Sequence, residues 1–116
     1  MTLRITFDLW LAAFLFTEAA ELPVYLLATR GRPLPQRLAI ALGASAITHP
    51  IVWWVIPRVP WPTYTHYFIA AEGFAVLAEA LLLRACKLRH PLLWALAANA
   101  TSVALGRLSR AYHGWP

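Results

Sequence analysis

Five residues of this sequence are best suited to chemistry, because each is an ionisable group inside a long apolar stretch. They are Glu18, Glu21, His49, Glu72 and Glu79. None of the four glutamates has a Lys or Arg at its own depth in its stretch. One ionised carboxylate at the centre of a membrane helix costs about 2.5 to 3.5 kcal/mol. We therefore expect these carboxyl groups to be neutralised by protons, by a bound cation or by contact with water.

The spacing of the polar residues predicts one polar face on each helix. Glu18 and Glu21 are three residues apart, which places both on one helical face. Glu72 and Glu79 are two turns apart and share a face of another helix. Polar side chains at matching spacings are expected to donate hydrogen bonds around these ligands; they are Tyr25, Ser45, Thr48, Asn99 and Ser102. Such faces leave unsatisfied groups if they meet lipid, so we expect them to point toward a common interior or a subunit interface.

Carboxylates together with one imidazole suit a divalent cation such as Zn, Mn or Fe, whereas carboxylates alone could carry protons. The sequence therefore predicts a small membrane protein that binds or transports a divalent metal or protons. A non-catalytic scaffold or accessory subunit is the alternative, in which the same residues dock against a second copy or a larger membrane partner. An enzyme that activates water with a glutamate and His49 ranks last, because no loop is long enough to build a substrate pocket.

The elements that must position these residues are long apolar helices. The composition is 60% hydrophobic and 13% charged, far from the roughly half apolar and one quarter charged of soluble domains. Four apolar blocks of about 18 to 20 residues are each long enough to cross a hydrocarbon core of about 30 Å. We expect an all-α membrane protein, a four-transmembrane-helix bundle in a single domain (1–116), with spans over about 9–28, 38–56, 66–84 and 91–109.

The distribution of charge predicts how the chain is oriented. Six of the ten basic residues lie in or beside the loops 29–37 and 85–90; they are Arg30, Arg32, Arg37, Arg84, Lys87 and Arg89. The positive-inside rule makes that side cytoplasmic, in a membrane of the bacterial cytoplasmic type, and puts both termini and the loop 57–65 outside. Five of the six tryptophans gather at the opposite end, as an interfacial aromatic belt does. Because this rule explains the net charge of +5, we expect no nucleic-acid partner.

A shift of 54 positions aligns the sequence with itself. The aligned pairs are Phe14 with Phe68, Glu18 with Glu72, Arg30 with Arg84, Ser45 with Asn99 and Thr48 with Ser102. The match predicts two parallel-repeated helical hairpins, over about 9–56 and 66–109, related by a pseudo-two-fold axis along the membrane normal. Chance agreement between two apolar hairpins is the alternative. Since four short helices enclose little volume, we also expect a homo-oligomer, most simply a dimer.

Overall fold

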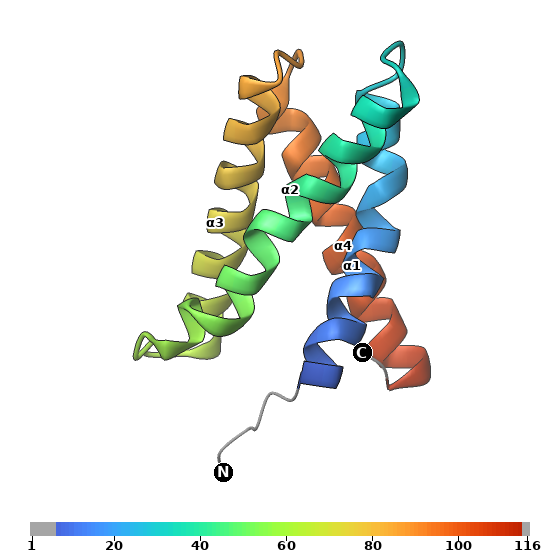
Figure 1. The fold of residues 1–116 in the computed structure, drawn as a ribbon. Coiled ribbons are helices and arrows are strands. Elements are labelled where there is room, and N and C mark those ends of the chain that lie inside the picture. The colour runs from blue at the N-terminus through green and yellow to red at the C-terminus, as the bar shows by residue number, and fades with distance from the viewer. Residues whose placement is uncertain (1–6, 115–116) are drawn as a thin grey trace.

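Four long α-helices form the protein. The computed structural model describes residues 7–114 and contains α1 (Phe7–Ala28), α2 (Leu34–Trp54), α3 (Tyr64–Ala85) and α4 (Pro91–His113), with a short 3-10 helix, η1 (Ile56–Arg58), after α2 (Figure 1). No strand occurs in this part of the chain. The prediction of an all-α fold with four helices is confirmed.

Local sequence signals explain where the helices begin and end, and why some are longer than predicted. Prolines occupy the first turns of α2 and α4, where a missing backbone N–H costs nothing because it would have no partner in the helix. The Thr63 side chain accepts a hydrogen bond from the His66 backbone N–H, so α3 begins two residues before its predicted start. Gly114 caps the end of α4 in a left-handed conformation. The last helical residue, His113, lies four residues beyond the predicted end of that span.

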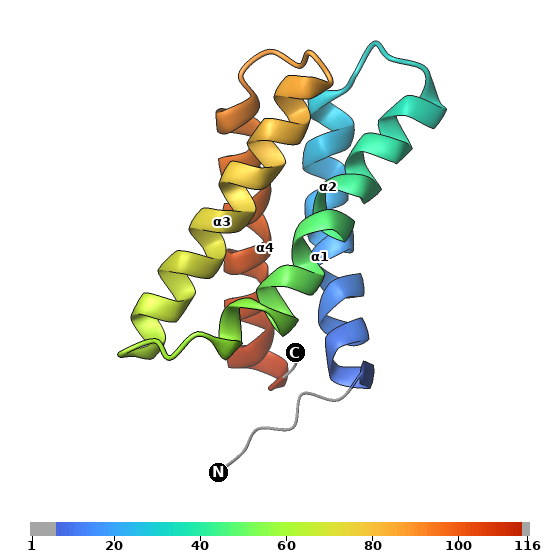
Figure 2. The same ribbon diagram turned by 60° about the vertical axis from the view of Figure 1, so that its left-hand side comes forward.

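The helices form a four-membered ring with alternating directions. α1 packs against α2 and α4, and α3 also packs against α2 and α4, whereas the diagonal pairs make no close backbone contact. The α1–α2 and α3–α4 loops lie at one end, and the α2–α3 connection and the start of α1 lie at the other (Figures 1 and 2). Each helix therefore has one face toward the centre of the ring, where side chains from all four helices can meet.

Two parts of the chain are long and apolar enough to cross a membrane by length and composition. They are Phe7–Ala28, which is α1, and Leu34–Arg58, which combines α2 with η1. α3 and α4 have similar lengths, 22 and 23 residues, but they do not meet both conditions. In length all four helices suit a membrane span, and two also suit it in composition.

Small residues form many of the contacts between helices, and many large apolar residues face outward. Ala41, Ala44, Ala95 and Ala98 are all 0% exposed, whereas leucines such as Leu81 are more than half exposed. A soluble bundle of this size would bury its large apolar side chains, because their burial drives folding in water. Small residues between closely approaching helices are typical of helix packing in membranes.

Substituting one of these interface alanines should destabilise the bundle. We expect Ala44→Leu to lower the free energy of unfolding by about 1 to 3 kcal/mol, since a larger side chain has no space between the helices. Ala46→Leu is the matched control, because Ala46 lies on the exposed face of the same helix. Thermal unfolding in detergent, followed by tryptophan fluorescence, measures both. Equal stability of the two variants would contradict this packing.

Candidate functional site

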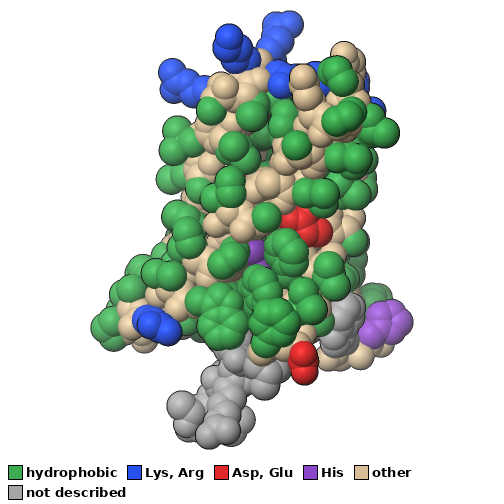
Figure 3. All heavy atoms as spheres, viewed as in Figure 1, with side chains coloured by type: hydrophobic (Ala, Val, Ile, Leu, Met, Phe, Trp, Pro, Cys, Tyr) green, Lys and Arg blue, Asp and Glu red, His purple; other side chains and the backbone are tan. Residues whose placement is uncertain are grey.

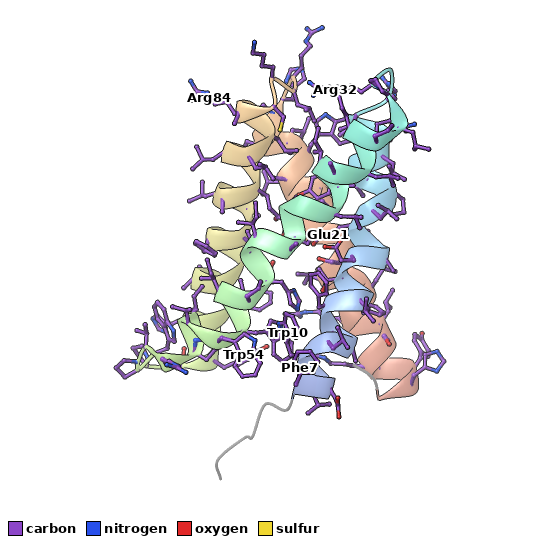
Figure 4. The ribbon with its side chains drawn as sticks, in the orientation of Figure 1. Phe7, Trp10, Glu21, Arg32, Trp54 and Arg84 are labelled. Atoms are coloured by element: carbon purple, nitrogen blue, oxygen red, sulfur yellow. The ribbon has the colours of Figure 1, made fainter. Side chains whose placement is uncertain are left out.

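The Glu21 side chain lies at the centre of the interior site. It projects from the middle of α1 into the bundle (Figure 4) and is only 1% exposed. The Ser45 hydroxyl, from α2, donates a hydrogen bond to Oε1 of Glu21 at 2.6 Å. The Ser102 hydroxyl, from α4, donates one to Oε2 at 2.7 Å. Each carboxyl oxygen thus has a donor from a different neighbouring helix, which matches the need of a buried carboxylate for hydrogen bonds.

Glu79 brings the remaining helix, α3, to the same site. Its carboxyl group is within hydrogen-bonding contact of the Glu21 carboxyl group. The Asn99 side-chain amide, from α4, donates to Oε2 of Glu79 and also to the carbonyl of Ala95. Two carboxylates have only acceptor atoms, so carboxyl groups in contact need a proton between them. Glu21 and Glu79 therefore form a carboxyl pair at the centre of the bundle.

Glu18 and Glu72 flank this carboxyl pair. Each lies close enough to Glu21 to interact with it electrostatically. Glu18 is buried, and neither of its carboxyl oxygens has a hydrogen-bond partner. Glu72 is half-buried. Hydroxyl and amide donors thus stabilise the central pair, whereas the Glu18 carboxyl group needs a proton or another cation to be stable at its buried position.

Tyr25 and Thr29 continue the interior polar face of α1 beyond Glu21. Tyr25 is 0% exposed, and its hydroxyl lies beside the Glu79 carboxyl group without a hydrogen bond of normal geometry. The Thr29 hydroxyl donates to the carbonyl of Tyr25 at 2.7 Å. Leu83 is also fully buried in this region. These side chains fill the interior of the bundle between the carboxyl pair and the end that carries the two hairpin loops.

Aromatic rings pack around His49. Its ring centroid lies 5.2 Å from that of Phe14, 5.8 Å from Trp53 and 6.1 Å from Trp10. Its Nε2 atom is buried without a hydrogen-bond partner. We call Trp10, Phe14, His49 and Trp53 the aromatic collar. Figure 4 shows Trp10 and Trp54 together near the end of the bundle where α1 begins, away from Glu21.

The predicted site residues therefore separate into three groups, and Thr48 belongs to none of them. Those that meet at the centre of the bundle are Glu21, Glu79, Ser45, Asn99 and Ser102. Glu18, Glu72 and Tyr25 lie beside that centre, and His49 belongs to the collar. The Thr48 hydroxyl donates only to backbone carbonyls of its own helix. Across residues 7–114, no three His, Cys, Asp or Glu side chains are grouped so that they could hold a metal ion.

Sequence reasoning missed the collar, although a signal for it was present. Phe14 lies four residues before Glu18, and Trp10 lies four residues before Phe14, so all three share one face of α1. The two tryptophans of the collar were interpreted only as interfacial anchors. Their packing around a buried histidine depends on how α1 approaches α2, which residue spacing within one helix does not define.

Two surface hollows lie away from the glutamates. The first, of about 390 Å³, is formed by the connection after α2 and the start of α3 and includes Trp61, Tyr64 and Tyr67. The second, of about 370 Å³, lies between α1 and α4 and includes Phe16 and Tyr112. No glutamate lines either hollow.

Comparison with known proteins gives no assignment: the chain matches no protein-family model, and neither curated proteins nor solved structures show a significant match to it.

Removing the two serine donors should destabilise the site. We expect Ser45→Ala and Ser102→Ala each to lower the free energy of unfolding by about 1 to 3 kcal/mol, because each leaves one buried Glu21 oxygen without its donor. Thr101→Val is the control, since the Thr101 hydroxyl bonds only to a carbonyl of its own helix. Thermal unfolding in detergent compares the three. A Thr101 variant as unstable as the serine variants would argue against a special role for these donors.

Proposed function

We propose that this protein is a small four-helix membrane protein whose interior glutamates bind and release protons. The observation that carries the proposal is the buried contact between the Glu21 and Glu79 carboxyl groups, with donors but, among residues 7–114, no Lys or Arg beside them. Four ionised carboxylates at this depth would cost on the order of 10 to 14 kcal/mol. That is similar to the net stability of a whole domain, about 5 to 15 kcal/mol, so protons must reside on most of them.

The packing of the bundle supports the membrane setting. The outward-facing leucines and the inward-facing alanines suit a lipid environment. Two of the four helices have both the length and the composition of a span, and we propose that α3 and α4 also cross, with their polar side chains turned inward. The basic loops then lie on the cytoplasmic side, and the termini and the α2–α3 connection lie outside.

Each carboxyl group has a distinct part in the proposed exchange. Glu21 is the proton acceptor, because the Ser45 and Ser102 hydroxyls stabilise its carboxylate. Glu79 carries the shared proton. Glu18, which lacks any donor, lies on the face of α1 that leads from Glu21 toward the aromatic collar. We propose that protons enter from the collar end through Glu18 and reach the central pair.

Neutralising the central pair should abolish proton movement. We expect proteoliposomes that contain Glu21→Gln or Glu79→Gln to lose at least about nine-tenths of the proton flux of the native protein, because an amide cannot take up and release a proton near neutral pH. Asp8→Asn is the matched control, since Asp8 is the one exposed acidic residue and lies at the start of α1. An internal pH-sensitive dye measures the flux.

Infrared spectroscopy tests whether the carboxyl pair holds a proton, independently of whether the protein transports protons. The carbonyl band of a protonated carboxylic acid should be present in the native protein and reduced in Glu79→Gln, whether or not protons cross the membrane. The band without any flux, together with a copurifying membrane partner, would favour an accessory subunit. Absence of the band in native protein would disprove the shared proton.

Elemental analysis tests directly whether the site binds a metal ion and not a proton. We expect protein purified in mild detergent, without added metal or chelator, to contain much less than one equivalent of Zn, Mn or Fe, because the described residues bring only the two central carboxylates into contact. A variant with Glu18→Gln, His49→Ala and Glu72→Gln provides the baseline. Stoichiometric metal in native protein and none in the folded variant would replace the proton hypothesis with a metal site.

A further inference from the structure

One end of the bundle carries a concentrated positive charge that the proposed proton site does not use. We call the six residues at this end the basic face; they are Arg30, Arg32, Arg37, Arg84, Lys87 and Arg89. Figure 3 shows Lys and Arg side chains gathered at the end with the hairpin loops, and Figure 4 places Arg32 and Arg84 there. No acidic side chain lies at this end among residues 7–114, because Asp8 is at the start of α1 and the glutamates lie inside.

Two of these arginines hold the loops in place through side-chain hydrogen bonds, and the side chains of the other four residues are exposed. The Arg32 guanidinium donates to the carbonyl of Cys86 at 2.6 Å, which ties the α1–α2 loop to the α3–α4 loop. Arg37 donates to the carbonyl of Leu26 at 2.6 Å. The side chains of the remaining four are exposed and form no hydrogen bond or ion pair with another residue of 7–114; they are Arg30, Arg84, Lys87 and Arg89.

The backbone adds positive potential at the same end. α2 and α4 both begin there, at Leu34 and Pro91. Neither helix has a side-chain cap at its N-terminus or an acidic residue in its first turn. The N-terminal ends of helices carry partial positive charge and unpaired N–H groups. The cations and both helix ends therefore favour an anion at this face.

Exposed leucines next to the cations indicate what kind of anion fits. Leu27 and Leu81 each precede a basic-face arginine by three residues, and Leu92 follows one by three residues. These leucines are 50%, 66% and 50% exposed. The cations lie at the helix ends, and the exposed leucines lie one turn further along the outer surface of the bundle. This arrangement matches a ligand that has a negative headgroup and long hydrocarbon chains. A free phosphate ion would use only the cations.

We propose that the basic face binds the headgroups of anionic phospholipids, with their acyl chains lying along the exposed leucines below it. Binding across the tied loops would hold the two hairpins together at this end. The inference rests on the membrane placement proposed above and does not depend on the glutamates. Loss of proton exchange in the Glu21→Gln variant would leave it unchanged.

Lipid titration in a neutral detergent tests the proposal. Phosphatidylglycerol should raise the unfolding temperature of the native protein, and phosphatidylcholine should not. We expect the double variant Arg30→Gln, Arg84→Gln to bind phosphatidylglycerol about thirtyfold more weakly, because each basic residue near an anionic membrane surface contributes a factor of about five. Both side chains are exposed and form no hydrogen bond with another residue of 7–114, so the fold should persist.

The matched control removes two cations from the opposite end. Arg58→Gln with Arg107→Gln gives the same change in net charge, and this variant should bind phosphatidylglycerol like the native protein. Equal stabilisation by the two lipids, or equal loss of binding in the two double variants, would overturn the proposal. Stabilisation by inorganic phosphate alone at similar concentration would also overturn it, since the ligand would then be a free anion.

Discussion

The burial of one carboxyl group, that of Glu21, is the constraint on which the rest of this bundle depends. Its two oxygens take donors from α2 and α4, and it contacts the Glu79 carboxyl group of α3. A single side chain of α1 thereby touches each of the other three helices. Because a buried carboxyl group without donors is costly, the relative rotation of all four helices must keep these contacts. The polar centre therefore fixes which helix faces point inward.

This interior is organised unlike that of a soluble bundle. Alanines fill the narrow contacts between helices, and the centre contains glutamates, serines and an asparagine, while leucines cover the outside. In water such an arrangement would expose apolar surface and gain little from burial. In lipid, leucine side chains lose nothing by facing outward, and close packing with interhelical hydrogen bonds supplies the association energy. Packing and polarity thus support the same proposed environment.

The two ends of the bundle differ in chemistry, and the carboxyl pair lies between them. Aromatic rings pack around His49 toward the start of α1. At the other end, Tyr25, Thr29 and Leu83 are completely or almost completely buried, and the basic face lies beyond them. In the proposed proton pathway, protons therefore enter at the collar end, and the end next to the tied loops is closed. This asymmetry also separates the proton site from the proposed lipid site.

The sequence by itself predicted the four helices and a polar face on each. These features follow from apolar length and from the spacing of polar residues within single helices, which are local properties. The repeat of 54 residues stays a prediction. Tertiary structure alone decided how these faces combine: Ser45 and Ser102 bond to Glu21, Asn99 bonds to Glu79, and His49 packs with aromatic rings. Residue spacing defines a face, but only the rotation and approach of neighbouring helices determine which side chain it meets.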